Sequence, residues 1–223
     1  MSPISGETCE ICGERAPGLQ QDSESQACTS CQEARPLFHK ATAYGSYDGG
    51  LRELIHLLKY DRVEPAANVL GKMLAEAVIK LEVAAPLVVV PVPLYRSKRR
   101  QRGFNQAELI ARNALRELAL PRVELMTDVL ERHRDTVSQI GLTRSQRNEN
   151  IRGAFRVAHP NRVSGRDVLV VDDVLTTGTT ASECARVLRK AGAKQVWVAT
   201  VARTLKTSGV GFEIEPEFAA QAS

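Results

Sequence analysis

The sequence predicts an α/β protein whose mostly parallel sheet is flanked by helices, with a small four-cysteine segment before it. Short apolar runs rich in β-branched residues alternate with stretches of helical periodicity, which is typical of βαβ units. Two Cys-x-x-Cys pairs near the N-terminus lie in a stretch with few large apolar residues. The chain has 223 residues, of which 43% are hydrophobic, enough for one α/β domain with a small addition.

Charge and hydropathy exclude several classes of protein. The net charge is +4, so the local distribution of charge is more informative than its total. Residues 1–8 have neither the basic nor the apolar region of a secretory signal peptide. The longest apolar run, residues 86–94, contains three prolines and is too short to span a membrane. We therefore expect a cytoplasmic protein with no membrane segment of its own.

The four N-terminal cysteines predict a structural zinc site. They are Cys9, Cys12, Cys28 and Cys31. Paired thiolates at this spacing in a reducing compartment favour tetrahedral Zn²⁺, and four thiolates leave no open coordination position. A redox pair or a bare tail is the alternative. Because Ile11 and Leu19 are the sole sizeable aliphatic residues between them, we expect no hydrophobic core here. The segment would fold on zinc, independently of the rest.

The next part of the chain predicts one strand and two helices. Residues 41–47 form a short apolar run that ends at an Asp-Gly-Gly turn. Apolar residues then recur with helical spacing over residues 51–58 and again over residues 66–77. His56 falls within the first helix, where we interpret it as a partly exposed residue rather than a metal ligand.

A second apolar run, residues 87–91, predicts a buried strand that prolines bring to an end. Five cations follow within residues 96–102. A charge run is usually a solvated loop, but ligands collect at the carboxyl ends of strands in open α/β sheets. We therefore favour anion binding at this position. A helix is expected from Phe104.

A second positive cluster lies farther along the chain. We expect residues 128–132 to form a strand and residues 143–150 a short helix. The cluster comprises Arg132, Arg134, Arg144, Arg147, Arg152 and Arg156. His133 stands between two of these arginines, which favours a solvated surface residue over a pH switch.

The stretch 168–180 organises the whole sequence. Residues 168–171 are apolar and mostly β-branched, which suits a strand buried on both faces. Asp172 and Asp173 follow at the expected end of that strand. Residues 176–180, Thr-Thr-Gly-Thr-Thr, then join the strand to a helix from Thr179, and free backbone N–H groups at such a junction attract anions.

These features predict a site for a ribose 5-phosphate. Ionised carboxylates only accept hydrogen bonds, so two of them suit a vicinal diol. The loop lacks the Gly-Lys pair of a P-loop and the three spaced glycines of a dinucleotide-binding turn. The alternative is purely structural, namely a strand, an acidic turn and a threonine helix cap.

The last predicted elements follow this stretch. Cys184 falls on the helix face that we expect to be buried, so we interpret it as a packed core thiol. Residues 195–201 predict a further strand. From Arg203 onward the sequence has no periodicity, which indicates a loose tail.

The stretch 168–180 resembles the binding motif of the type I phosphoribosyltransferases, with four apolar residues, two acids, a spacer and Thr-Thr-Gly-Thr-Thr. The resemblance implies phosphoribosyl pyrophosphate (PRPP) as the ligand, with Asp172 and Asp173 on the ribose hydroxyls. Mg²⁺ would be carried mainly by the pyrophosphate and water. The 5-phosphate would be held by Thr176, Thr177, Gly178, Thr179 and Thr180.

Further motifs resemble one branch, the ComF family. They are the cysteine pairs, Tyr47-Asp48-Gly49, Leu51-Arg52, Lys59-Tyr60, Pro91-Val92-Pro93, Arg102-Gly103-Phe104-Asn105-Gln106, Gln139, Leu142, Arg147, Asn150 and Gly153-Ala154-Phe155. The resemblance spans residues 9–203 and implies a role in the uptake of external DNA or its use as a nutrient. It implies a zinc-binding segment (1–36), a phosphoribosyltransferase-like domain (37–203, with a hood at 37–85 and a core at 86–203) and a loose tail (204–223).

The family pattern also implies a pyrophosphate site after the second strand. Its residues would be Pro91, Val92, Pro93, Leu94, Tyr95, Arg96, Arg99 and Arg102. In a phosphoribosyl transfer the two aspartates would act as catalytic residues that orient the diol and stabilise positive charge on the ribose. Mg²⁺ and the arginines would stabilise the leaving group. The sequence identifies neither a general base nor an acceptor pocket.

Two functions remain open. One is a magnesium-dependent phosphoribosyltransferase with an unknown acceptor. The other is a non-catalytic PRPP-binding module whose basic surface binds single-stranded DNA during uptake, alongside machinery such as a competence helicase. Excess cations favour the second, although aromatic residues, at 4%, offer little base stacking. The candidate DNA-binding residues are Lys98, Arg99, Arg100, Arg132, Arg134, Arg147 and Arg152.

Overall fold

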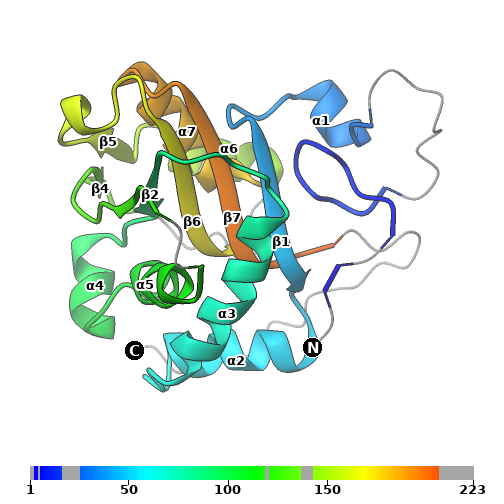
Figure 1. Cartoon of the computed structure of the whole chain (residues 1–223), viewed down its shortest axis with the longest axis vertical. Helices are drawn as coiled ribbons and strands as arrows, with labels where there is room; N and C mark the ends of the chain where they lie inside the picture. Colours follow the sequence, from blue (N-terminus) through cyan, green and yellow to red (C-terminus); the bar gives the residue numbers. More distant parts are fainter. Residues whose placement is uncertain (1–2, 5, 17–25, 119–120, 137–142, 206–223) are drawn as a thin grey trace.

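The protein is built around a five-stranded parallel sheet (Figure 1). The structure is a computed structural model that describes residues 3–4, 6–16, 26–118, 121–136 and 143–205. The spatial order of the strands is β1 (Lys40–Ser46), β7 (Gln195–Arg203), β6 (Asp167–Leu175), β2 (Leu87–Pro91) and β3 (Val123–Leu125). All four strand pairs are parallel, which confirms the α/β class that the sequence predicts.

Helices cover both faces of this sheet (Figure 1). On one face lie α2 (Gly49–Lys59), α3 (Ala66–Ile79) and α5 (Gln106–Leu118), and on the other α7 (Thr179–Lys190) and α6 (Arg144–Ile151). Successive residues of a strand face opposite sides. Accordingly, Leu169 and Val171 pack in the cluster with α3 and α5, whereas Val168 and Val170 pack in the cluster with α7. Two covered faces explain why the strand sequences are continuously apolar.

Smaller elements complete the chain. They are α1 (Thr29–Glu33), α4 (Arg96–Arg102), the single-turn helix η1 (Pro160–Arg162), and β4 (Leu130–Arg132) paired with β5 (Phe155–Val157). The β4–β5 pair is antiparallel and forms a separate two-stranded sheet. β5 contacts α7, so this small sheet lies on the α7 side of the molecule.

Several predicted boundaries were wrong. β6 does not end at residue 171 but continues through the two aspartates to Leu175, because β7 keeps pairing with it as far as Arg203. Arg203 therefore ends a strand and does not begin a loose tail. Residues 96–102 form the helix α4 rather than a loop. The strands β3 and β5 were missed, because each has three residues, too few for periodicity to register.

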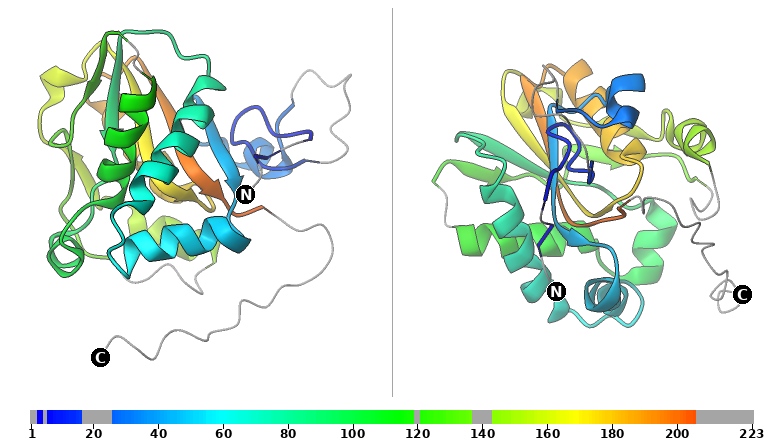
Figure 2. Two further views of the ribbon diagram at one scale, coloured as in Figure 1. Left: turned by 60° about the horizontal axis from the view of Figure 1, so that its bottom comes forward. Right: turned by 90° about the vertical axis from the view of Figure 1, so that its right-hand side faces the viewer.

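The N-terminal segment packs against the sheet edge, contrary to the expectation that it has no hydrophobic core. Ile11 and the four cysteines are buried in one cluster with Phe38 and Ala41. The Ala41 backbone N–H donates to the Ile11 carbonyl at 2.7 Å. Figure 2 shows the segment beside β1. The apolar partners that the segment lacks are therefore supplied by residues outside it, such as Phe38 and Ala41.

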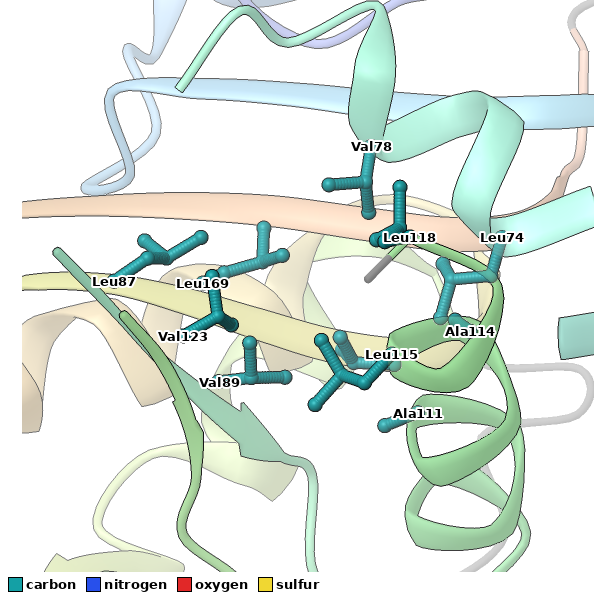
Figure 3. Close-up of a pocket in the computed structure, with 11 residues that line it drawn as sticks. Leu74, Val78, Leu87, Val89, Ala111, Ala114, Leu115, Leu118, Val123 and Leu169 are labelled. Carbon is teal, nitrogen blue, oxygen red and sulfur yellow. The ribbon is translucent and has the colours of Figure 1, made fainter. Parts of the chain in front are cut away.

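A small gap lies between α3, α5 and the sheet (Figure 3). Its volume is about 10 Å³, and its lining is entirely aliphatic, including Leu74, Ala111 and Leu169. A space of this size holds at most one water, and water needs polar partners. The gap is therefore a packing defect of the core and not a ligand site.

Candidate functional site

The order of the strands creates a crevice at the carboxyl ends of β6 and β2. The chain leaves β6 through α7 toward β7 on one side, whereas it leaves β2 through α5 toward β3 on the other. Pro91, the last residue of β2, pairs with Val171. Beyond that point β6 continues without β2 beside it. Ligands of open α/β sheets bind where neighbouring connections diverge in this way, and the acid pair lies at this place.

Asp173 faces the side of the sheet covered by α2 and α5. It is 5% exposed. Its carboxylate forms an ion pair with Lys59, the last residue of α2, and the Gln106 side chain on α5 also favours its ionised form. The carboxylate is thus held by groups from two helices that are far from it in sequence.

Asp172 faces the opposite side, toward α7 and the small sheet. Its Oδ1 accepts the backbone N–H of Asp173 at 2.9 Å. Arg132, on β4, interacts electrostatically with this carboxylate. Burial lowers the pKa of Arg132, and the charge of Asp172 offsets part of that lowering. The two aspartates are adjacent in sequence but therefore have different neighbours.

The pKa values of the two aspartates are shifted in opposite directions. Burial, followed by the charge of Asp173, raises the pKa of Asp172 well above its usual range. Burial is also the largest effect on Asp173 and acts in the same direction, but the Lys59 ammonium, Asp172 and Gln106 together outweigh it and lower the pKa of Asp173. Two buried carboxylates this close cannot both ionise easily, so Asp173 carries the charge.

The loop 176–178 leads from β6 into α7. Gly178 has φ +77°, a conformation that glycine adopts without strain, and its carbonyl accepts the N–H of Ser182 at 2.8 Å. The hydroxyls of Thr177 and Thr179 hydrogen-bond to each other. Free N–H groups at the start of this twelve-residue helix and several hydroxyls suit an anion.

The loop after β2 is fixed by a buried asparagine. Val92 donates its N–H to the Val171 carbonyl at 2.9 Å. Asn105 donates its side-chain amide to the Val92 carbonyl at 3.1 Å and accepts the N–H of Ala107 at 3.1 Å. The expected pyrophosphate loop therefore has a defined start next to the acid pair.

The basic helix α4 follows this loop, and its seven residues all remain at least partly exposed. Arg102 lies over the Tyr60 ring, with its Cζ 5.7 Å from the ring centroid, and donates to Gln106. The Nη2 atom of Arg99 lies 3.9 Å from Oε2 of Glu108. Since Gln106 also lowers the pKa of Asp173, it lies between Arg102 and the acid pair.

Sequence reasoning assigned no role to Lys59, Asn105 or Gln106. A signal existed for Lys59, because it lies four residues after the buried Ile55 and thus on the inward face of its helix. A lysine on that face needs a partner. Asn105 and Gln106 stand at the start of α5, where buried polar side chains require hydrogen bonds.

Two arginines of the second positive cluster make contacts within the protein. Arg132 lies over the Phe155 ring and donates to Thr136. Arg134 donates to the carbonyls of Asn150 and Arg152, each at 2.8 Å. Gln139 and Leu142, which contribute to the family resemblance, lie outside the described residues.

The four N-terminal thiols are brought together. The Sγ atoms of Cys9, Cys12, Cys28 and Cys31 all lie within 4.8 Å of one another. The Sγ atoms of Cys12 and Cys28 are 3.7 Å apart, near the sulfur separation of about 3.8 Å that tetrahedral zinc with Zn–S bonds of about 2.3 Å requires. The donor set fits zinc. Cys184 is buried separately on α7.

Among the described residues, none of the helices combines the length and hydrophobicity that crossing a bilayer requires.

The chain is similar in sequence to known proteins. Residues 104–212 match the profile of the phosphoribosyl transferase domain. Competence protein F of Haemophilus influenzae is 32% identical, covering 86% of this chain and 84% of the relative. DNA utilization protein YhgH of Escherichia coli is also 32% identical, covering 84% and 82%. Competence protein ComFC of Bacillus subtilis is 22% identical, covering 86% and 75%.

The parallel sheet and the matched domain define the class as a type I phosphoribosyltransferase-like protein. Within that class, the similarity over most of both chains shows that the protein belongs to the ComF family.

Proposed function

We propose that this protein binds PRPP with Mg²⁺ in the crevice between β6 and β2. One observation carries the proposal: the acid pair, the Thr-rich loop 176–180 and the loop after β2 meet where the connections of β6 and β2 diverge. A phosphate cradle beside a diol acceptor matches the two ends of a phosphorylated ribose. Residues 91–95 then lie on the side where the pyrophosphate would extend.

Each part of the ligand has a group to hold it. The 5-phosphate lies on Thr176–Thr180, mainly on neutral donors. The ribose hydroxyls donate to Asp172 and Asp173. The pyrophosphate lies over residues 91–95 with Arg96, Arg99 and Arg102 near it. Mg²⁺, when bound, screens the charge of the pyrophosphate and makes it a better leaving group.

If the protein turns PRPP over, its residues support a dissociative transfer. The bond between ribose C1 and the pyrophosphate oxygen breaks, and the electron pair leaves with the pyrophosphate. The positive charge left on the ribose lies beside ionised Asp173, which stabilises it. An acceptor of unknown identity then forms the new bond to C1.

The names of the relatives support a cellular role in the uptake or use of DNA. The exposed cations of α4 favour a second candidate, a non-catalytic PRPP-binding module that holds single-stranded DNA. Lys98 and Arg100 are exposed and are not among the cations assigned to the pyrophosphate. A competence helicase would be a suitable partner for such a module. We also propose a cytoplasmic location, because four neighbouring thiols need reducing conditions.

We propose that the N-terminal thiols hold a structural zinc ion. The support is the close grouping of four sulfur atoms and the absence of an open coordination position when all four ligands are protein thiolates. Zinc there would hold the chain on the edge of β1.

Titration calorimetry of Mg-PRPP into the protein tests the main proposal. Wild type should bind, and Asp172→Asn with Asp173→Asn should weaken binding by at least about 10-fold, because a hydrogen bond to a charged acceptor such as Asp173 contributes roughly 1.5–3 kcal/mol. Glu131→Gln on β4, whose side chain is 43% exposed, is the control. Equal affinity in the acid variant would refute the ribose assignment.

The same titration in the presence of a single-stranded oligonucleotide separates the two candidates. Affinity for PRPP that ignores the oligonucleotide, together with pyrophosphate release when nucleobases are added, favours the enzyme. Coupled binding without pyrophosphate release favours the DNA-binding module.

A further inference from the structure

Lys59 occupies one of the carboxylates that the proposed ligand needs. Its ammonium pairs with Oδ2 of Asp173, and the two side chains are 17% and 7% exposed. A carboxylate held in this way by an ammonium has less capacity to accept hydrogen bonds from a ribose. The ligand must therefore compete with Lys59 or displace it.

The pair is a poor device for stability alone. Removing an ammonium and a carboxylate from water costs free energy that their attraction barely recovers, and apolar residues of similar volume often stabilise as well or better. Leu51, Ile55 and Leu58 already anchor α2 in the core. A buried ion pair beside these anchors, at the end of β6, indicates a functional use.

The surroundings of Lys59 lead toward the pyrophosphate side. Gln106 contacts Asp173 and accepts from Arg102, and Arg102 packs on Tyr60, the residue after Lys59. Arg62 donates to the Gln101 carbonyl at 2.7 Å. The end of α2 is thus tied to α4, which places Lys59 between the acid pair and the basic helix.

We propose that Lys59 is an exchanging cation: it pairs with Asp173 in the empty site and moves to the diphosphate of the bound ligand. When a ribose hydroxyl donates to Asp173, the buried ammonium needs another anion, and the ligand brings one. Lysine has a flexible stem with three rotatable N–H donors, so this exchange leaves α2 in place. The inference rests on the proposed PRPP site and assigns Lys59 to the diphosphate half of it.

Two probes separate this role from a general effect on Asp173. Mg-PRPP carries the diphosphate, whereas ribose 5-phosphate lacks it. In Lys59→Met we expect the Kd for Mg-PRPP to rise by at least about 10-fold, the loss expected for one charged hydrogen bond. The Kd for ribose 5-phosphate should change much less, because the loss of the cation that favours ionised Asp173 is offset by the loss of a competitor for its oxygens. Lys72→Met, a lysine on α3 whose side chain is 65% exposed, should change neither.

The outcomes are distinct. Wild-type protein that binds neither probe contradicts the proposed function itself. Wild type that binds Mg-PRPP while Lys59→Met binds it equally well contradicts the exchange alone. A similar loss for both probes would show that Lys59 only shapes Asp173, which also overturns the proposal.

Wild-type protein decides the matter if Lys59→Met does not fold. Its lysines can be dimethylated with ¹³C, which retains their charge, and observed by NMR. The Lys59 signal is identified as the one that is missing from the spectrum of Lys59→Arg. Mg-PRPP should shift this signal and ribose 5-phosphate should shift it differently. A signal that saturating Mg-PRPP leaves unmoved would rule out the exchange.

Discussion

At the scale of single residues, two buried ion pairs lie near the carboxyl ends of the neighbouring strands β6 and β7. Lys59 and Asp173 pair beneath the crevice. At the end of β7, the guanidinium of Arg203 pairs with Glu14 at 2.9 Å and donates to the Cys12 carbonyl at 2.6 Å. Each pair joins residues that are distant in sequence. The charges were visible in the sequence, but their partners were not, because pairing depends on the packed fold.

Replacing Arg203 should destabilise the protein strongly. Arg203→Met leaves the Glu14 carboxylate buried without its cation, since the two side chains are 5% and 7% exposed, and breaking such a pair costs about 3–5 kcal/mol. Urea unfolding measures the loss. Arg156→Met, which breaks an exposed pair with Glu131, is the control and should cost about 0–1 kcal/mol. Equal effects would show that the buried pair has no special weight.

At the scale of elements, periodicity predicted the long helices and the buried strands, and local pairing decided their ends. The run 168–171 predicted β6. The strand continues beyond this run to Leu175, and there it pairs with β7 but no longer with β2. Alternation along the strand could not show that Asp172 and Asp173 meet different helices. The helix α4 was missed because its seven residues are all polar or charged, so the sequence has no apolar face at helical spacing to indicate a helix.

Close packing of α3 against α5 should make Gly71 intolerant of a side chain. An added Cβ would lie 2.4 Å from Cβ of Asn113 and 3.0 Å from the backbone N of Ala114. Gly71→Ala should therefore lose about 1–3 kcal/mol of unfolding free energy, although alanine favours helices by up to about 1 kcal/mol. The exposed substitution Glu76→Ala on the same helix should stay within about 0.5 kcal/mol. A stabilised Gly71→Ala variant would contradict this packing.

At the scale of the whole molecule, the motifs predicted the class, the acid pair, the loop and the cysteine cluster. These were predictable because each is local in sequence. The sequence did not predict that the cysteine segment packs on the sheet, since its partners Phe38 and Ala41 lie outside it. The position of the crevice likewise depends on the spatial order of the strands, which could not be predicted from the sequence.

Metal removal should therefore affect the whole domain. Trp197, the single tryptophan, pairs in register with Lys40 of β1 and lies 4.4 Å from the His39 ring, so its fluorescence reports on the edge where the segment packs. Chelation should move its unfolding transition to lower urea, because zinc binding contributes folding free energy. An unchanged transition, with the cysteines newly reactive, would show that the segment folds independently.

Hydrogen exchange with and without Mg-PRPP tests the central claim most directly. The account predicts slower amide exchange at residues 172–180 and at the non-proline residues 92, 94 and 95, where the ligand would cover backbone N–H groups, and little change along α3. Unchanged exchange in both stretches at saturating Mg-PRPP, or protection confined to another surface, would contradict a PRPP site between β6 and β2.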